Sequence, residues 1–282
     1  MNKNRDLDNT NNKFTISTIN TRGLSNAKIY ELEELIENEN DILCITETQM
    51  KHLKVNFSPR MEILNQMREL DDRNGGGILF LFPTNNIEMD KIETRSKDIL
   101  CAKCSIKKFN FIIICVYLSV DNHNLNKQIY SEVEELISKN NDIEIVMLGD
   151  FNSHIGFLGR QKVNRNGELF LKFIENMNLI ILNDDPKTEG EITWKRGEQN
   201  SVIDFILVNG LMYEKFNNMY IDEEQEKFDL SDHNLLTANF TIKNNDSSKK
   251  LTKDCVYYKI TDDTKEKFVQ EIEQRLKNHK LE

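Results

Sequence analysis

Polar side chains that could bind a metal ion or transfer a proton follow several apolar stretches of this sequence. Residues 147–154 read MLGDFNSH, so Gly149, Asp150, Asn152 and His154 come at the end of an apolar run. Residues that bind and transform ligands are concentrated on loops positioned by a rigid scaffold. A carboxylate there can bind a divalent cation or accept a proton from water, and an amide can donate hydrogen bonds to an anion.

The same arrangement recurs at other apolar runs of the chain. Because strand ends lie at the rim of a core, we expect these polar groups to gather in one site. The groups are Asn20 at the end of FTISTIN, Glu47 after DILCIT, Tyr117 at the end of FIIICVY, Asp204 near the start of VIDFILV, and Asp232 and His233 in LSDH.

Each group taken singly also has a purely structural explanation. An Asp-x-Asn sequence after a strand is common turn chemistry, and Ser231–His233 could be a turn that caps itself. Glu47 could be a solvated loop residue, and Tyr117 an ordinary strand aromatic. Asp204 is harder to explain this way, because a buried carboxylate is costly unless it is paired. A structural ion pair would satisfy it.

The elements that must position these groups can be read from apolar periodicity. Many short strands with few helices predict an α/β protein in which two sheets pack face to face with helices outside, a four-layer α/β sandwich. Helices are expected after the N-cap Ser25 and over residues 126–139 and 167–177. Strands are expected at 14–20, 41–46, 78–82, 99–106, 109–117, 143–148, 179–182, 202–208 and 235–242, with a tight turn at Lys107–Lys108.

The net charge of −10 excludes a protein that holds nucleic acid by bulk positive charge. It leaves room for an enzyme that binds a polyanion through a divalent metal and a local basic groove. The five cysteines are an odd number and do not form a disulfide framework. Cys101 and Cys104 have a CxxC spacing, but residues three apart on a strand face opposite sides, so we expect ordinary packing.

No segment predicts membrane insertion or secretion. The longest apolar run, Phe111–Val116, is far shorter than the roughly 20 residues that span a bilayer. The polar N-terminus lacks the apolar segment of a secretory signal. Together with the lack of a disulfide framework, this predicts a reducing compartment, the nucleus or the cytoplasm. We also expect the protein to be a monomer.

Composition divides the chain into four parts. Residues 1–12 are rich in Asn and Asp and predict disorder. Residues 13–243 hold the apolar runs and form the expected domain, and residues 244–256 begin with the linker-like NNDSSKK. Residues 257–282 predict an amphipathic helical segment, for which an isolated helix of unknown partner is the simpler interpretation.

In chain order the polar motifs are N, ET, Y, GDFN, ID and SDH. Each is weak alone, but six in this order are specific. Over Phe14–Ile242 the sequence resembles the exonuclease–endonuclease–phosphatase superfamily, which includes abasic-site endonucleases, deoxyribonuclease I-like enzymes, inositol polyphosphate phosphatases and retrotransposon endonucleases. The resemblance implies the deoxyribonuclease I-like form of the four-layer sandwich and metal-dependent phosphodiester hydrolysis.

The resemblance implies that Glu47 binds Mg²⁺ and that Asn20 orients the ion or the phosphate. Asp232 would be a neighbouring carboxylate that assists in binding the metal. Mg²⁺ prefers hard oxygen ligands and keeps some of its waters, so one or two carboxylates suffice. The ion can polarise the phosphoryl oxygen and stabilise the leaving oxyanion. Mn²⁺ is the alternative ion.

The resemblance also assigns the catalytic groups. Asp150 would position or deprotonate the attacking water. Tyr117 and Asn152 would contact the scissile phosphate, because neutral donors stabilise charge in the transition state. Asp204 and His233 would form a pair in which the aspartate sets the tautomer and favours the cationic imidazole.

Within the superfamily the sequence is most similar to endonucleases of non-LTR (LINE-type) retrotransposons. Residues 192–209 read ITWKRGEQNSVIDFILVN and resemble the retroelement pattern of Thr-Trp, a polar loop and Ser-x-Ile-Asp. Thr193 and Ser201 would then contact phosphate or sugar. The loop at 195–200, with Lys195 and Arg196, could enter a groove of the substrate; a solvated hairpin is the structural alternative.

One difference from the abasic-site repair enzymes supports the similarity to retrotransposon endonucleases. Those enzymes typically place an acidic residue two positions after the asparagine, where this chain has Arg22 in INTRGL. Arg22 would be a substrate contact, and its presence weakens any second metal ligand there. Residues 257–276 also resemble the segment that precedes the reverse transcriptase in such elements.

The resemblance therefore implies a Mg²⁺-dependent endonuclease that nicks DNA and leaves a 3′ hydroxyl. A reverse transcriptase domain of the same element is a candidate partner. Two alternatives remain open: an abasic-site repair enzyme or other phosphodiesterase or phosphatase of the superfamily, and a catalytically inactive relic that binds nucleic acid.

Overall fold

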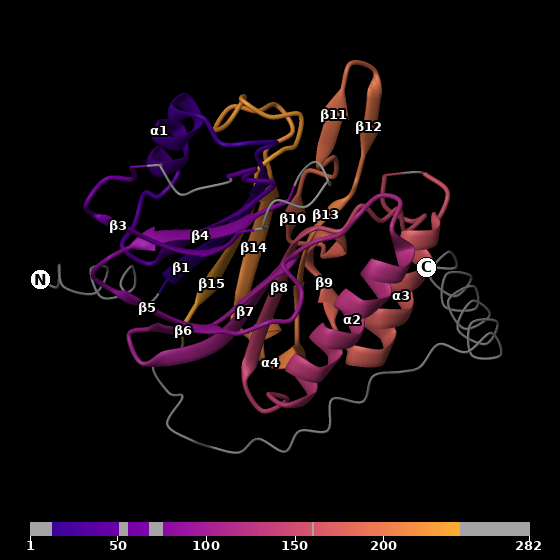
Figure 1. Cartoon of the computed structure of the whole chain (residues 1–282), viewed down its shortest axis with the longest axis horizontal. Coiled ribbons are helices and arrows are strands. Elements are labelled where there is room, and N and C mark those ends of the chain that lie inside the picture. Colours follow the sequence, from indigo (N-terminus) through magenta and orange to yellow (C-terminus); the bar gives the residue numbers. More distant parts are fainter. Residues whose placement is uncertain (1–12, 51–55, 68–75, 160, 243–282) are drawn as a thin grey trace, which may run out of the picture. The chain divides into compact units, whose positions relative to one another are not determined.

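Two large β-sheets, a two-stranded hairpin and four α-helices lie in the described part of the chain, which in this computed structural model comprises residues 13–50, 56–67, 76–159 and 161–242 (Figure 1). The seven-stranded sheet has the order β10 (Thr188–Glu189), β14 (Phe216–Ile221), β15 (Leu236–Thr241), β1 (Lys13–Asn20), β2 (Asp41–Thr46), β4 (Ile78–Pro83) and β3 (Met61–Gln66). The six-stranded sheet has the order β5 (Ile87–Ile92), β6 (Ile99–Ile106), β7 (Phe109–Tyr117), β8 (Glu144–Asp150), β13 (Asp204–Val208) and β9 (Ile180–Ile181). The helices are α1 (Asn26–Glu34), α2 (His123–Ser138), α3 (Arg165–Met177) and α4 (Gly210–Tyr213), with a 3₁₀ helix at Leu182–Asp184 and a separate hairpin of β11 (Trp194–Arg196) and β12 (Gln199–Ser201).

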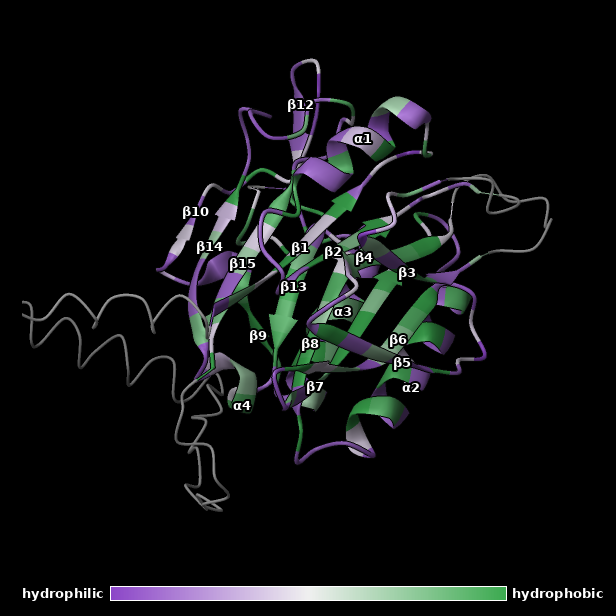
Figure 2. Cartoon of the chain, turned by 90° about the vertical axis from the view of Figure 1, so that its left-hand side faces the viewer, coloured by the Kyte–Doolittle hydropathy of each residue, from purple (hydrophilic) through white to green (hydrophobic). Residues whose placement is uncertain are grey.

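The apolar side chains form the three contact layers of a four-layer sandwich. One core lies between the sheets and includes Phe14, Phe80 and Phe111. A second core packs the six-stranded sheet against α2 and α3, and a third packs α1 against the seven-stranded sheet. Figure 2 shows hydrophobic central strands and a hydrophilic β11–β12 hairpin. The predicted α/β sandwich is confirmed.

Cys101 and Cys104 illustrate how strand alternation sorts side chains. Both lie on β6 and both are buried, but Cys101 belongs to the core under the helices and Cys104 to the core between the sheets. The prediction that the CxxC spacing reflects ordinary packing agrees with this arrangement.

Several local predictions are confirmed. Ser25 caps α1 by accepting a hydrogen bond from the Lys28 backbone N–H. The β6–β7 hairpin turns at Lys107 and Lys108, which both have positive φ, as a two-residue turn between twisted strands requires. Helix α2 starts at His123, three residues before the predicted start, because Asn122 provides the cap.

Strands β3, β5 and β14 were not predicted. Their sequences, MEILNQ, IEMDKI and FNNMYI, mix polar and apolar residues without a long apolar run. β3 and β5 each lie at the edge of a sheet, where one side of the strand has no neighbour.

The predicted N-terminal disorder at 1–12 and the helical segment at 257–282 lie outside the described residues, as does the linker at 244–256. None of the helices in the described part of the chain is both long and apolar enough to cross a membrane.

Candidate active site

The carboxyl ends of β1 and β2 bring Asn20 and Glu47 together. These strands are parallel neighbours, and Asn20 pairs in register with Thr46, the residue before Glu47. The Asn20 side-chain amide donates to Glu47 Oε1 at 3.0 Å. Glu47 itself has a positive φ of 49°, an uncommon backbone state for a residue other than glycine.

Asp150 occupies the corresponding position in the other sheet. It is the last residue of β8 and lies between two neighbours in register, Tyr117 of the parallel β7 and Asp204 of the antiparallel β13. Sheet pairing alone therefore brings three of the predicted residues side by side. Tyr117 is half-buried and packs against the core between the sheets.

The glycine before Asp150 is a steric requirement. Gly149 has a φ of +130°, and a Cβ there would lie 2.1 Å from the Val116 carbonyl oxygen of β7. Any side chain would push β8 away from β7 and misplace Asp150. This explains why the apolar strand ends in Gly-Asp.

Asn20 connects the two sheets at the site. Besides its bond to Glu47, its amide nitrogen donates to Asp150 Oδ2 at 2.9 Å, and its own oxygen accepts the Arg22 backbone N–H at 2.9 Å. Asn20 is fully buried. It therefore orients both carboxylates, while its oxygen points to the backbone.

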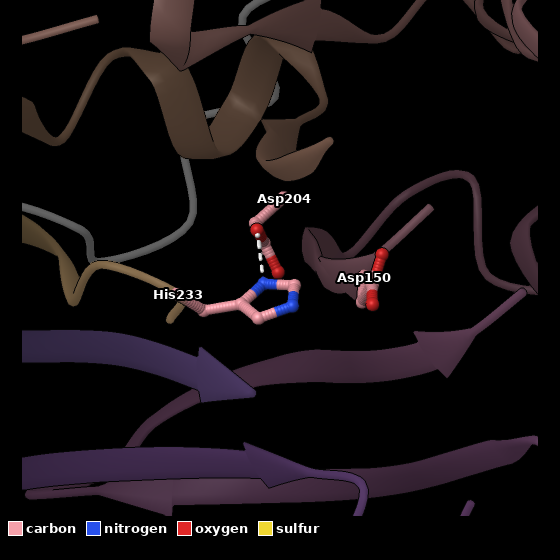
Figure 3. A group of neighbouring side chains, drawn as sticks. All are labelled: Asp150, Asp204 and His233. Atoms are coloured by element: carbon pink, nitrogen blue, oxygen red, sulfur yellow. Dashed lines mark hydrogen bonds and ion pairs between the residues drawn. The ribbon is translucent and has the colours of Figure 1, made fainter. Parts of the chain in front are cut away.

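The loop before β15 completes the site. His233 Nδ1 lies 2.8 Å from Asp204 Oδ2, and the other ring nitrogen is directed toward Asp150 (Figure 3). The ligand atoms of Asp150, Asp204 and His233 all lie within 4.8 Å of one another. The Ser231 hydroxyl donates to the Asn20 carbonyl and so fastens this loop to β1.

Burial and charge set the protonation of this group. Burial lowers the pKa of His233, but the charge of Asp204 and its hydrogen bond, with Asp150 and Asp232, outweigh that effect and raise it to about 9. Burial, followed by the charges of Asp204 and Glu47, raises the pKa of Asp150 to about 8, although His233 and Asn20 oppose the shift. The site thus carries more negative charge than its own cations offset.

Asn152 follows Asp150 in a left-handed conformation with φ 46°. Its backbone N–H donates to Asp150 Oδ1, and its side-chain amide donates to the Leu118 carbonyl. Behind it, the buried Asn166 at the start of α3 donates to the Asn152 carbonyl and to the loop after β7. The two loops that follow β7 and β8 are therefore held as one unit.

Thr193 and Ser201, which the motif predicted as contacts to phosphate or sugar, are both buried. Thr193 is fully buried, and its hydroxyl accepts hydrogen bonds from the backbone N–H groups of Ile203 and Asp204. Ser201 is also buried and accepts a bond from Gln161. Both residues lie at the base of the β11–β12 hairpin, where the Thr193 backbone N–H donates to the Ser201 carbonyl and the Thr193 hydroxyl positions the start of β13.

The predicted basic contacts lie on exposed structure. Lys195 and Arg196 are exposed on the β11–β12 hairpin, which projects beyond the sheets (Figure 1). Arg22 is half exposed, and its guanidinium contacts Asp232 Oδ2. Asp232, predicted to assist the metal, is therefore paired with a cation of the chain itself.

Two residues outside the predicted set also belong to the site. Gln49 donates to Glu47 Oε2 at 3.3 Å, so both oxygens of Glu47 face amide donors. Ser231 fastens the loop before β15 to β1. Ser231 stands inside the LSDH motif, whereas nothing in the type or spacing of Gln49 pointed to it.

The donor set fits a hard divalent cation. Mg²⁺ prefers carboxylate oxygens, and Glu47 and Asp150 meet here through Asn20. The pKa of Asp150 is raised first by its burial and then by the negative charges of Asp204 and Glu47, and a nearby cation would offset that charge. The cluster of Asp150, Asp204 and His233 suits the ion less well, because His233 Nδ1 is already hydrogen-bonded to Asp204. The carboxylates of Glu47 and Asp150 are therefore the better candidate ligands.

The chain is similar to known proteins in part of its sequence and in its fold. Residues 111–237 match a family model described as endonuclease-reverse transcriptase. Among curated proteins none matches the chain. Solved structures do match, at identities that establish the fold alone.

Three of these structures cover most of the chain. The endonuclease domain of TRAS1, a telomere-specific non-LTR retrotransposon, matches with a TM-score of 0.63 and 16% identity over 82% of this chain and 99% of that domain. The AP endonuclease LMAP of Leishmania major gives 0.67 and 11% over 86% and 92%, and the 3′-5′ exonuclease NExo of Neisseria meningitidis gives 0.62 and 18% over 81% and 100%. The predicted resemblance is confirmed: this chain has the fold of the exonuclease–endonuclease–phosphatase superfamily, and residues 111–237 match its endonuclease-reverse transcriptase family.

Proposed function

We propose that the chain is a Mg²⁺-dependent phosphodiester hydrolase that nicks DNA and leaves a 3′ hydroxyl, as the endonuclease of a non-LTR retrotransposon. One observation carries the proposal. A buried Asp204–His233 pair faces Asp150, and Asn20 links Asp150 to Glu47. This arrangement supports an acid–base role for Asp150 and His233 and a metal-binding role for Glu47 at one reacting centre.

Glu47 would hold the ion, with Asn20 and Gln49 fixing the direction of its carboxylate. When bound, the ion polarises the phosphoryl oxygen and stabilises the leaving oxyanion. Mn²⁺ satisfies the same oxygen donors and is expected to substitute.

Separate residues of the chain would accept the proton of the attacking water and stabilise the charge on the phosphate. A cation held at Glu47 would oppose the raised pKa of Asp150, so that Asp150 could be ionised at neutral pH, orient the attacking water and accept its proton. His233 stays cationic at neutral pH because Asp204 raises its pKa, so its free ring N–H stabilises charge that develops on the phosphate. Tyr117 and Asn152 flank Asp150 and supply neutral donors to the phosphate oxygens.

A DNA substrate is favoured by the exposed cations beside the site. Lys195 and Arg196 on the hairpin would contact the DNA backbone, and Arg22, in the loop after β1, lines a cleft together with Arg196. An endonuclease of this kind would act together with a reverse transcriptase domain of the same element.

A second activity is favoured by the fold likeness to LMAP, an AP endonuclease, and to NExo, a variant of which has been solved as a 3′ phosphatase bound to a product DNA hairpin. Under this alternative the same residues would cleave only at abasic sites or remove terminal phosphates. The substrate distinguishes the two activities.

The test uses supercoiled plasmid, an intact duplex and an abasic-site duplex, each with Mg²⁺ or with chelator. Asp150→Asn and His233→Ala remove the acid–base groups, and Asp142→Asn is the matched control, because Asp142 is exposed near the start of β8. We expect metal-dependent nicking of intact plasmid by the wild type and the control, with a loss of at least ~100-fold in both site variants.

Cleavage confined to the abasic duplex would favour the repair activity. Failure of all three substrates to react with Mg²⁺ or Mn²⁺ would overturn the nuclease proposal and support the inactive relic.

A further inference from the structure

Arg22 stands in an unusual place for a cation. It follows Asn20 by two residues, adopts a positive φ of 47°, and its backbone N–H donates to the Asn20 side-chain oxygen. This conformation turns its side chain toward the loop before β15, where the guanidinium contacts Asp232 Oδ2. The loop of Arg22 is thus tied to the residue that orients Glu47 and Asp150.

Asp232 has the properties of a cation ligand. Its side chain is only 16% exposed, and its second oxygen, Oδ1, is buried without a hydrogen-bond partner among the described residues. It lies next to His233 in the chain. A carboxylate in this setting requires a positive partner, because burying an uncompensated charge costs several kcal/mol.

We propose that Arg22 is a fixed cation that satisfies Asp232 in place of a second divalent ion, so that the site binds one divalent ion through Glu47 and no more. This rests on the proposed metal dependence of the site. A guanidinium does not lose its proton in proteins, so the pairing persists at any working pH. A divalent ion at Asp232 would have to displace this cation.

The rest of the loop keeps the guanidinium in place. Lys28 of α1 donates from Nζ to the carbonyls of Thr21 and Gly23, on either side of Arg22. The pKa of Lys28 is lowered by its partial burial and then by the charge of Arg22, while the charge of Asp232 opposes the shift. Arg22 and Asp232 line an open cleft of about 620 Å³ together with Arg196.

The test counts bound ions directly. Mn²⁺ binding to the full chain is measured by electron paramagnetic resonance of the free ion and by calorimetry, without substrate. We expect one ion per wild-type chain and two for Arg22→Gln, because Asp232 is then released. Arg22→Lys, which keeps the charge, is the matched control and should bind one.

Arg22→Gln/Asp232→Asn should return the number to one, which assigns the added ion to Asp232. Circular dichroism verifies that each variant is folded, and Arg22 is half exposed, so the substitutions leave the cores intact. Two ions in the wild type, or the same number in the wild type and Arg22→Gln, would overturn the inference.

The failure of the proposed function gives a different result. If the wild type binds no Mn²⁺ but Arg22→Gln binds one ion, the proposed metal dependence of the native site is wrong, while the proposed role of Arg22 is supported. If neither binds an ion, both are wrong.

Discussion

Asp204 makes the largest contribution to keeping His233 charged. Burial lowers the pKa of the imidazole, but the charge and hydrogen bond of Asp204, together with the charges of Asp150 and Asp232, raise it to about 9. We expect Asp204→Asn to lower the pKa of His233 by ~1 unit or more, measured by NMR titration of the histidine ring in metal-free protein. Asp142→Asn should leave it unchanged. A ring that still titrates near 9 in Asp204→Asn would contradict this account of the pair.

The raised pKa values of Asp150 and His233 have a consequence for stability. The folded pKa of His233 lies above its ordinary value of 6.5, so the stability that it contributes is present below that value and is lost as pH rises through about 9. The folded pKa of Asp150 is raised from 3.8 to about 8, so folding also loses stability as the pH rises over that interval. Both groups act in the same direction.

Replacing Asp150 by Asn should therefore stabilise the metal-free protein at alkaline pH. We expect the free energy of unfolding at pH 9 to rise by ~1–3 kcal/mol, because a buried charge beside Asp204 is removed. At pH 5, where Asp150 is protonated, the difference should shrink. Urea unfolding at both pH values measures it, and an unchanged difference between them would contradict the assignment of the raised pKa to Asp150.

The chemical types at the site could be predicted from the sequence, but their surroundings could not. Asp150, Asp204 and His233 lie together because strand ends converge, and the motifs indicated those ends. Thr193 was predicted as a substrate contact and is buried instead, because a residue type does not tell whether its loop folds over it. The pairing of Arg22 with Asp232 depends on two loops separated by more than two hundred residues.

At the scale of elements, the sequence predicted strands with long apolar runs and missed strands that had none. β7 and β8, buried on both faces, carry FIIICV and IVML. β14 reads FNNMYI, where alternation is interrupted by adjacent asparagines and the pairing with β15 is irregular. Such a strand is stabilised by neighbours distant in sequence, which local periodicity does not register.

The amino-terminal ends of α2 and α3 meet the site through a buried asparagine pair. Asn166 Oδ1 accepts from Asn126 and lies 2.8 Å from His123 Nδ1, and its amide donates to carbonyls of both catalytic loops. We expect Asn166→Ala to lower the free energy of unfolding by ~2–3 kcal/mol, because several buried groups lose their partner. The exposed Asn141→Ala is the matched control.

The same substitution should also affect turnover, because it releases Asn152 beside Asp150. We expect kcat to fall more than KM rises under conditions where the variant is fully folded. Loss of stability with unchanged kcat would show that the asparagine pair supports the fold without positioning the site.

Under the proposed function the whole molecule binds a polyanion despite its net charge of −10, so its positive charge has to act locally. The β11–β12 hairpin offers Lys195 and Arg196 at the site end, whereas Lys107 and Lys108 form a comparable basic turn before β7. β7 runs nine residues from that turn to Tyr117, so the Lys107–Lys108 turn lies roughly 30 Å from the end of the strand at the site. Substitutions at this distant basic turn therefore serve as the matched control for substitutions on the hairpin.

Lys195→Gln/Arg196→Gln should weaken DNA binding about tenfold at moderate salt and reduce the slope of log affinity against log salt by about two, because two phosphate contacts are lost. Lys107→Gln/Lys108→Gln makes the same change in net charge and should alter neither quantity appreciably. Fluorescence anisotropy of a labelled duplex, titrated at several salt concentrations with Asp150→Asn as the background, measures binding without cleavage. Equal weakening by both pairs would mean that net charge alone governs binding, and the hairpin would then have no specific part in holding DNA.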